Sequence, residues 1–273
     1  MNIINRRKLY ALSLIIGTLL GIIAVFLVFF FNYDLIILAF RNYDGALEVV
    51  IIISLRIILL VIISLYLFNK WFKQEAQFLS DIPFLLGLFF FILIFGKAID
   101  LFWDLTFFTF NDFTVLLLLK IRYLIIIIEV VPLIYLGMEI IFFRLQDRFT
   151  KLKDKDYMNR LRIRLIILTI IIESIAIIIM PNTTILGLLL PIILIPSLIG
   201  IVYIFYMAYR LNRLKIIKPG ILTIGFFLYM VSNILRRVMQ NILGETAFYV
   251  IVVELVDIFI FIIIFFGLYK KPV

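Results

Sequence analysis

The chain has 273 residues, and 66% of them are hydrophobic, against about 45–50% in an average soluble domain. Its formal net charge of +9 would suit a nucleic-acid partner only if a soluble fold presented the basic residues on one face. The composition excludes such a soluble fold. We therefore expect an all-α, polytopic integral membrane protein that lies in a lipid bilayer and binds no nucleic acid.

The absence of two residue types excludes much cofactor and catalytic chemistry. The sequence contains no His and no Cys. Zinc or haem sites with His or Cys ligands, Ser-His and Cys-His nucleophiles and disulfides therefore all lack their required atoms. The spacing of Gly96, Asp100 and Asp104 resembles the second half of the CDP-alcohol phosphotransferase motif, but the first half of that motif is missing. We expect no cofactor, no metal site and no enzymatic activity.

Apolar runs long enough to cross a membrane recur along the chain. A hydrocarbon core of about 30 Å requires about 20 apolar residues per helix. Eight such runs occur, at about 9–31, 47–68, 82–103, 115–143, 161–180, 185–209, 219–240 and 247–268. We therefore predict a bundle of eight transmembrane helices, with seven as the alternative. The segment 32–46 either extends the first span or lies at the membrane interface.

Residues that typically begin or end helices separate these runs. Ser80 or Asp81 is the expected N-cap of the third run, with Pro83 in its first turn. Later breaks follow the same chemistry, at Pro181-Asn182, Pro219-Gly220 and Gly244. The first run follows Arg6, Arg7 and Lys8 and is longer than the roughly 7–15 apolar residues of a signal peptide, so we expect it to be a retained span.

The basic residues predict the orientation of the bundle. Assigning alternate loops to the same side collects 19 of the 26 Lys and Arg residues on that side. The opposite loops contain only Arg41 outright. By the positive-inside rule, we expect a multi-pass cell-membrane protein with both termini cytoplasmic. The charges of the loop 144–160 are expected to fix topology, and the alternative is a site for anionic lipid or for a cytoplasmic protein partner at 144–164.

Charged residues also lie inside the predicted spans. The predicted orientation places every charged residue inside a span, except Glu139, at the middle or in the extracytoplasmic half of the membrane. These candidate site residues are Arg56, Lys97, Asp100, Asp104, Lys120, Arg122, Glu129, Glu173, Arg236, Arg237, Glu254 and Asp257. An unpaired charge at the bilayer centre costs roughly 2.5–3.5 kcal/mol on insertion scales, so these residues cannot all be scattered toward lipid.

Helical spacing brings several of these charges to common faces. Lys97, Asp100 and Asp104 are spaced i, i+3 and i+7. Arg122 and Glu129 are likewise seven residues apart on one face, and Glu254 and Asp257 are three residues apart. We expect a cavity of paired charges that opens to the extracytoplasmic side. Its arginines could clamp a carboxylate or phosphate, and its acidic groups could hold a cation or an amine. The alternative is that the pairs only lock helices together.

A weak internal repeat bears on the domain organisation. LFFFILIFGKAID aligns with IGFFLYMVSNILR, and EVVPLIY aligns with ELVDIFI. Four spans per half would give a parallel 4+4 repeat, with halves 1–150 and 151–273 inside a single membrane domain, 1–273. In a sequence rich in Ile and Phe such matches also arise by chance, so the repeat remains one of two interpretations.

The one-sided polarity favours a receptor, because a transporter needs a path from its site to both sides of the membrane. We expect a non-enzymatic receptor or sensor for a small charged ligand. Since no soluble output domain is attached, its signal would pass to a separate partner. The first alternative is a secondary transporter or ion-coupled permease, and the second is a structural membrane subunit of a complex.

Overall fold

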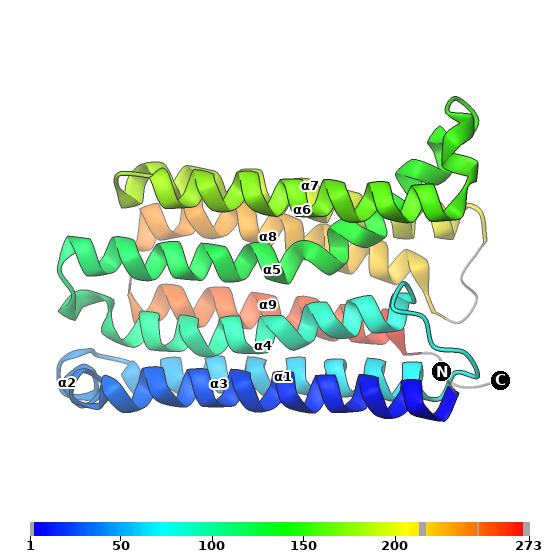
Figure 1. Ribbon diagram of the computed structural model, residues 1–273. Coiled ribbons are helices and arrows are strands. Elements are labelled where there is room, and N and C mark those ends of the chain that lie inside the picture. Colours follow the sequence, from blue (N-terminus) through cyan, green and yellow to red (C-terminus); the bar gives the residue numbers. More distant parts are fainter. Residues whose placement is uncertain (1–2, 213–216, 245, 270–273) are drawn as a thin grey trace. The chain divides into compact units, whose positions relative to one another are not determined.

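The computed structural model describes residues 3–212, 217–244 and 246–269. These residues contain helices and no strand (Figure 1). The elements in chain order are α1 (Ile3–Phe31), α2 (Tyr33–Asn42), α3 (Ala46–Phe72), α4 (Ile82–Thr106), η1 (Phe107–Thr109), α5 (Asp112–Leu145), η2 (Thr150–Lys153), α6 (Lys155–Ile179), α7 (Thr183–Arg210), α8 (Pro219–Leu243) and α9 (Ala247–Leu268). Each of the eight predicted apolar runs overlaps one long helix.

Within the described residues, 6 helices are long and apolar enough to cross a membrane, namely α1, α3, α4, α7, α8 and α9. They indicate a membrane-embedded, multi-pass helical protein. The α5 and α6 helices match the other two predicted runs, and their crossing of the membrane remains a prediction. Segment 32–46 does not simply extend the first span, because the chain breaks at Asn32 and forms the short helix α2.

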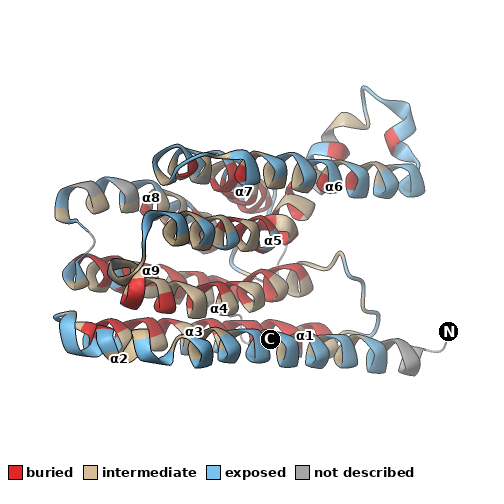
Figure 2. Ribbon diagram, turned by 60° about the vertical axis from the view of Figure 1, so that its left-hand side comes forward, coloured by how far each residue is buried: buried red, intermediate tan, exposed pale blue. Residues whose placement is uncertain are grey.

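The helices gather into two compact units, 1–111 and 112–273. In the first unit, α3 packs along α4, and α1 and α2 also contact α4. The Ser64 hydroxyl donates a hydrogen bond of 3.1 Å to the Gly87 carbonyl and so fixes the antiparallel register of α3 and α4. In contrast, α1 has no buried residue along its apolar length, and its residues are intermediate or exposed (Figure 2). The predicted halves 1–150 and 151–273 remain a hypothesis.

The second unit is a chain of neighbouring helix pairs. The α5 helix packs against α6 and α7, α7 against α8, and α8 against α9. The α8–α9 pair is the closest, because a Cβ atom on Gly267 would lie 2.7 Å from Leu222 Cδ2 and one on Gly225 would lie 2.6 Å from Ile264 Cγ1. Small residues allow helix backbones to approach in this way.

The helix ends follow the predicted chemistry. Asp81 is the N-cap of α4, and Pro83 lies in its first turn. The Asp81 carboxylate accepts hydrogen bonds from the Phe78 amide and the Trp71 indole, at 2.9 and 3.1 Å, so it also anchors the end of α3. Asn182 caps α7 by accepting from the Ile185 amide.

Some predicted charges lie outside the described residues. They are the basic residues Arg213, Lys215, Lys270 and Lys271, and the side chains of Arg6, Glu139, Arg144 and Arg237. At these positions, the predicted orientation of the chain in the membrane depends on the sequence alone.

Candidate functional site

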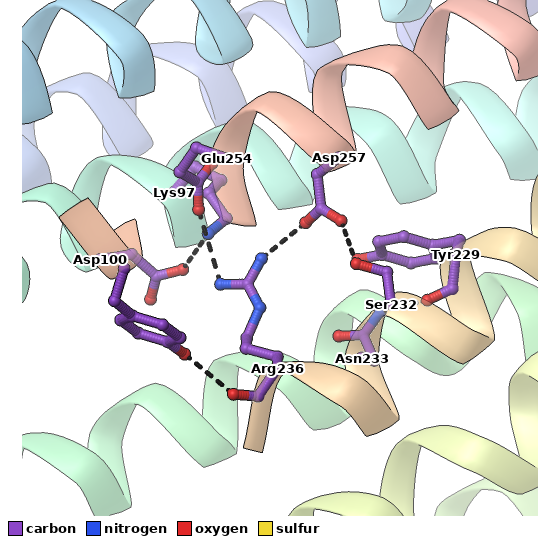
Figure 3. A network of polar contacts seen from close by, with 9 residues as sticks. Lys97, Asp100, Tyr229, Ser232, Asn233, Arg236, Glu254 and Asp257 are labelled. Carbon is purple, nitrogen blue, oxygen red and sulfur yellow. Dashed lines mark hydrogen bonds and ion pairs between the residues drawn. The ribbon is translucent and has the colours of Figure 1, made fainter. Parts of the chain in front are cut away.

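An arginine on α8 binds two carboxylates of α9 (Figure 3). Arg236 Nη2 lies 2.6 Å from Asp257 Oδ2, and Arg236 Nη1 lies 3.5 Å from Glu254 Oε1. The Ser232 hydroxyl donates to Asp257 Oδ1 at 2.6 Å. The Tyr249 hydroxyl donates to the backbone carbonyl of Arg236 at 3.3 Å. We call Ser232, Arg236, Tyr249, Glu254 and Asp257 the α8–α9 cluster.

The helical pattern places this cluster on the packed face. Buried α9 residues recur every three or four positions, and Glu254 and Asp257 fall on this stripe between Val253 and Ile260. On α8, Ser232 is buried and Arg236 follows one turn later. The antiparallel register set by Gly225 and Gly267 brings these positions together.

The two carboxylates differ in the length of their contacts with Arg236. Both oxygens of Asp257 accept short hydrogen bonds, one from Ser232 and one from Arg236. The Glu254 contact to Arg236 is long, at 3.5 Å. Both acidic side chains are only 1% exposed, whereas Arg236 is 27% exposed. The arginine side chain is therefore more accessible than either carboxylate, although its Nε atom is buried.

In the first unit, four predicted site residues lie on the α3–α4 pair. Lys97 and Asp100 form an ion pair of 2.9 Å within α4 (Figure 3). Arg56 is buried in the packed stripe of α3, and the Ser64–Gly87 register puts it at about the level of Lys97. Asp104 lies one turn beyond Asp100 and is half-buried. The α3–α4 pair thus gathers two basic and two acidic groups within a few turns.

In the second unit, α5 holds a separate ion pair. Arg122 Nη1 donates to Glu129 Oε1 at 2.8 Å, and both side chains are largely buried. Lys120 lies elsewhere, because its ammonium donates to the Ile178 carbonyl at 2.8 Å, in the last turn of α6. A cation there complements the negative end of the helix dipole. Lys120 therefore contributes to the junction between α5 and α6.

Glu173 is half-buried on α6, and its buried atom Oε2 has no hydrogen-bond partner among the described residues. Arg237 is part of α8, but its side chain lies outside the described residues. The structure thus forms local pairs from several predicted residues, and the predicted cavity itself remains a hypothesis.

Two polar features were not expected from the sequence. Arg162 belongs to the basic segment 144–164, which was expected to face the cytoplasm. It is nevertheless 2% exposed, and its Cζ atom lies 4.2 Å from the centroid of the Tyr135 ring on α5. Its spacing from the buried residues Ile166 and Ile177 could have indicated a packed position. Ser232 was also missed, although it precedes Arg236 by one turn.

Among the residues that the structure describes, no group of three or more acidic side chains could hold a metal ion. Comparison of the chain with protein-family models, curated proteins and solved structures gives no match.

Proposed function

We propose that the chain is a cell-membrane protein with eight spans and cytoplasmic termini, and that it is a non-enzymatic receptor for a small organic anion. The six apolar helices support the membrane position. The distribution of basic residues supports the orientation. In this topology the α8–α9 cluster lies toward the extracytoplasmic side.

One observation carries the choice of an anion. Arg236 is the accessible member of its cluster, while Glu254 and Asp257 are almost fully buried. A ligand that arrives from the accessible side meets a guanidinium, which binds carboxylates and phosphates in a bidentate manner. The long Arg236–Glu254 contact is the one that such a ligand would replace, because the Arg236–Asp257 contact is short and is supported by Ser232.

Replacement of this contact provides a route to a signal. An anion bound to Arg236 releases Glu254 from its contact and changes the polar bridge between α8 and α9. A ligand shifts a conformational equilibrium by its differential affinity for the two states. The resulting change in helix packing would reach a cytoplasmic partner through the basic segment 144–164.

The test is ligand-induced stabilisation of the purified protein and of two variants. Small carboxylates, inorganic phosphate and amines are added in turn, and the melting temperature is measured. We expect an anion to raise the melting temperature of the wild type and not that of Arg236→Gln. Glu254→Gln should bind the same anion more tightly, because it removes a competing carboxylate.

Stabilisation by a cation in place of an anion would point to a site formed by the carboxylates. Stabilisation by an amine that Glu254→Gln abolishes would overturn the choice of an anion. If none of the compounds stabilises the wild type and both substitutions only lower the melting temperature, the cluster is a structural lock. The protein would then fit a structural membrane subunit.

The second candidate is a secondary transporter, and the ion pairs within single helices favour it. Lys97 pairs with Asp100 within α4, and Arg122 pairs with Glu129 within α5. These pairs move with their own helix, so helices can rearrange without separating them. Uptake of the stabilising anion into liposomes, dependent on a proton or cation gradient, would establish transport. Binding without uptake would favour the receptor.

A further inference from the structure

Glu173 on α6 has surroundings unlike those of the paired carboxylates. Its Oε2 atom is buried and has no hydrogen-bond partner among the described residues. Its neighbours Ile171, Ile172 and Ile175 expose apolar side chains, as expected of a helix face toward lipid. The side chain thus lies at the edge between the packed face of α6 and its apolar outer face.

Two contacts fix where Glu173 lies along α5. Lys120 reaches the carbonyl of Ile178, and Arg162 stacks on Tyr135, so α5 and α6 run antiparallel in a defined register. This register puts Glu173 at about the level of Ile125. Arg122 and Glu129 bracket that level, and they pair with each other at 2.8 Å.

The remaining ionisable groups near this level are few. Those of α5 are Lys120, Arg122, Tyr123 and Glu129. The basic residues of α6 and η2, among them Arg162, Arg164, Lys151 and Lys153, lie toward the other end of α6. The α7 helix has no ionisable side chain between Thr183 and Val202. The cations that the register puts closest to this level are Lys120, which donates to the Ile178 carbonyl, and Arg122, which donates to Glu129 Oε1.

An ionised carboxylate in such surroundings is unfavourable. Transfer of a charge out of water without pairing costs far more than transfer of a neutral group, so an isolated buried acid instead takes up a proton. Glu129 and Asp257 are not expected to take up a proton in this way, because each accepts a short hydrogen bond from an arginine.

We propose that Glu173 is a proton-binding carboxyl group, held as the neutral acid within the membrane, and that it is a site of modification by lipophilic carbodiimides. The inference rests on the proposed membrane position of α6. It is independent of ligand binding at the α8–α9 cluster. In a receptor this group would make the α5–α6 pair sensitive to protons, and in a transporter it would supply a site for the coupling proton.

Carbodiimide chemistry distinguishes the neutral acid from a paired carboxylate. The acid proton passes to one carbodiimide nitrogen, and the carboxyl oxygen bonds to the central carbon to give an O-acylisourea. Acyl transfer to nitrogen then gives a stable N-acylurea. No group leaves, so the mass of the modified peptide rises by the full mass of the reagent.

The experiment treats the liposome-reconstituted protein with dicyclohexylcarbodiimide at neutral pH and locates the adducts by mass spectrometry. We expect an adduct on Glu173, its loss in Glu173→Gln, and little modification of Glu129 or Asp257. A water-soluble carbodiimide should leave Glu173 unmodified. Absence of the Glu173 adduct, or equal modification by the water-soluble reagent, would overturn the proposal.

A stability comparison supplies a second readout. Glutamine resembles the neutral acid, so Glu173→Gln should retain the melting temperature of the wild type. Glu129→Gln is the matched control, and it should lower the melting temperature because it removes the carboxylate that Arg122 contacts. An equal loss in the two variants would show that Glu173 is an ionised partner and would overturn the proposal.

Labelling of single cysteines at the two ends of α6 distinguishes a failure of this proposal from a failure of the predicted topology. The chain has no Cys, so Asp147→Cys and Pro181→Cys each introduce one thiol without background. If the two thiols react from opposite sides and Glu173 gives no adduct, the proton site fails although the topology holds. If both react from the same side, α6 does not span the membrane, and the basis of the proposal is lost.

Discussion

At the residue scale, two short hydrogen bonds hold the Asp257 carboxylate. It accepts from Ser232 and from Arg236, both at 2.6 Å, and its side chain is almost fully buried. Loss of a hydrogen bond to a charged group costs about 1.5–3 kcal/mol.

We therefore predict that Asp257→Asn lowers the free energy of unfolding in detergent by roughly that amount, about 1.5–3 kcal/mol. The exposed residue Asp147 provides the control, and Asp147→Asn should change the free energy by less than about 0.5 kcal/mol. Equal effects of the two substitutions would argue against a tightly bound Asp257.

The stacking of Arg162 on Tyr135 allows a second residue-scale prediction. Tyr135→Leu removes the ring beneath the guanidinium and should destabilise the protein by about 1–2 kcal/mol, since desolvated cation–π contacts have this magnitude. Tyr135→Phe retains the ring and should have little effect. Unfolding followed by circular dichroism would measure both. A large effect of Tyr135→Phe would instead assign the role to the hydroxyl group.

Helical spacing predicted part of the candidate site. It put Lys97 beside Asp100 and Arg122 on the face of Glu129, and the structure contains both ion pairs. The partners of Arg236 could not be assigned, because contacts between helices depend on their register. That register comes from the close approach at Gly225 and Gly267, which spacing along one helix does not reveal.

At the element scale, Gly267 determines how closely α8 and α9 pack. A Cβ atom there would lie 2.7 Å from Leu222 Cδ2 and 3.1 Å from the Leu222 backbone nitrogen. We predict that Gly267→Ala forces the helices apart and destabilises the protein by about 1–3 kcal/mol, as overpacking commonly does.

The matched control for this prediction is Gly17 on α1, where an added Cβ atom would meet nothing within 4 Å. Gly17→Ala should leave the melting temperature unchanged or raise it slightly, because alanine favours a helix. Thermal unfolding of both variants is the measurement. A neutral Gly267→Ala would contradict the close α8–α9 packing.

The long helices could be predicted from the sequence because each carries about 20 apolar residues between helix-breaking or capping residues. The short helix α2 was harder to predict. Its apolar stretch, LIILAF, follows that of α1 closely, and only the three residues Asn32, Tyr33 and Asp34 separate them. The Asn32 side chain donates to the Val28 carbonyl at 2.8 Å at the point where α1 ends.

At the scale of the whole molecule, the sequence indicated the membrane class but not the two compact units. Their boundary falls between Asn111 and Asp112. The connection between η1 and α5 is only two residues long, about as short as the one between α6 and α7. Which helices pack together depends on side-chain shape along their full lengths, and an apolar sequence provides little signal for that choice.

The proposals share one requirement, which is that α5 and α6 cross the membrane together with the six apolar helices. Labelling of single cysteines by a membrane-impermeant thiol reagent tests this requirement most directly. Four exposed positions in successive loops or helix ends are suitable: Glu75, Asp112, Asp147 and Pro181.

We predict that, in intact cells, cysteines at Asp112 and Pro181 react from outside, whereas those at Glu75 and Asp147 react only after the membrane is opened. Labelling of the Asp112 and Asp147 variants from the same side would show that α5 does not span. Labelling of the Asp147 and Pro181 variants from the same side would show the same of α6. Either result would contradict the eight-span account.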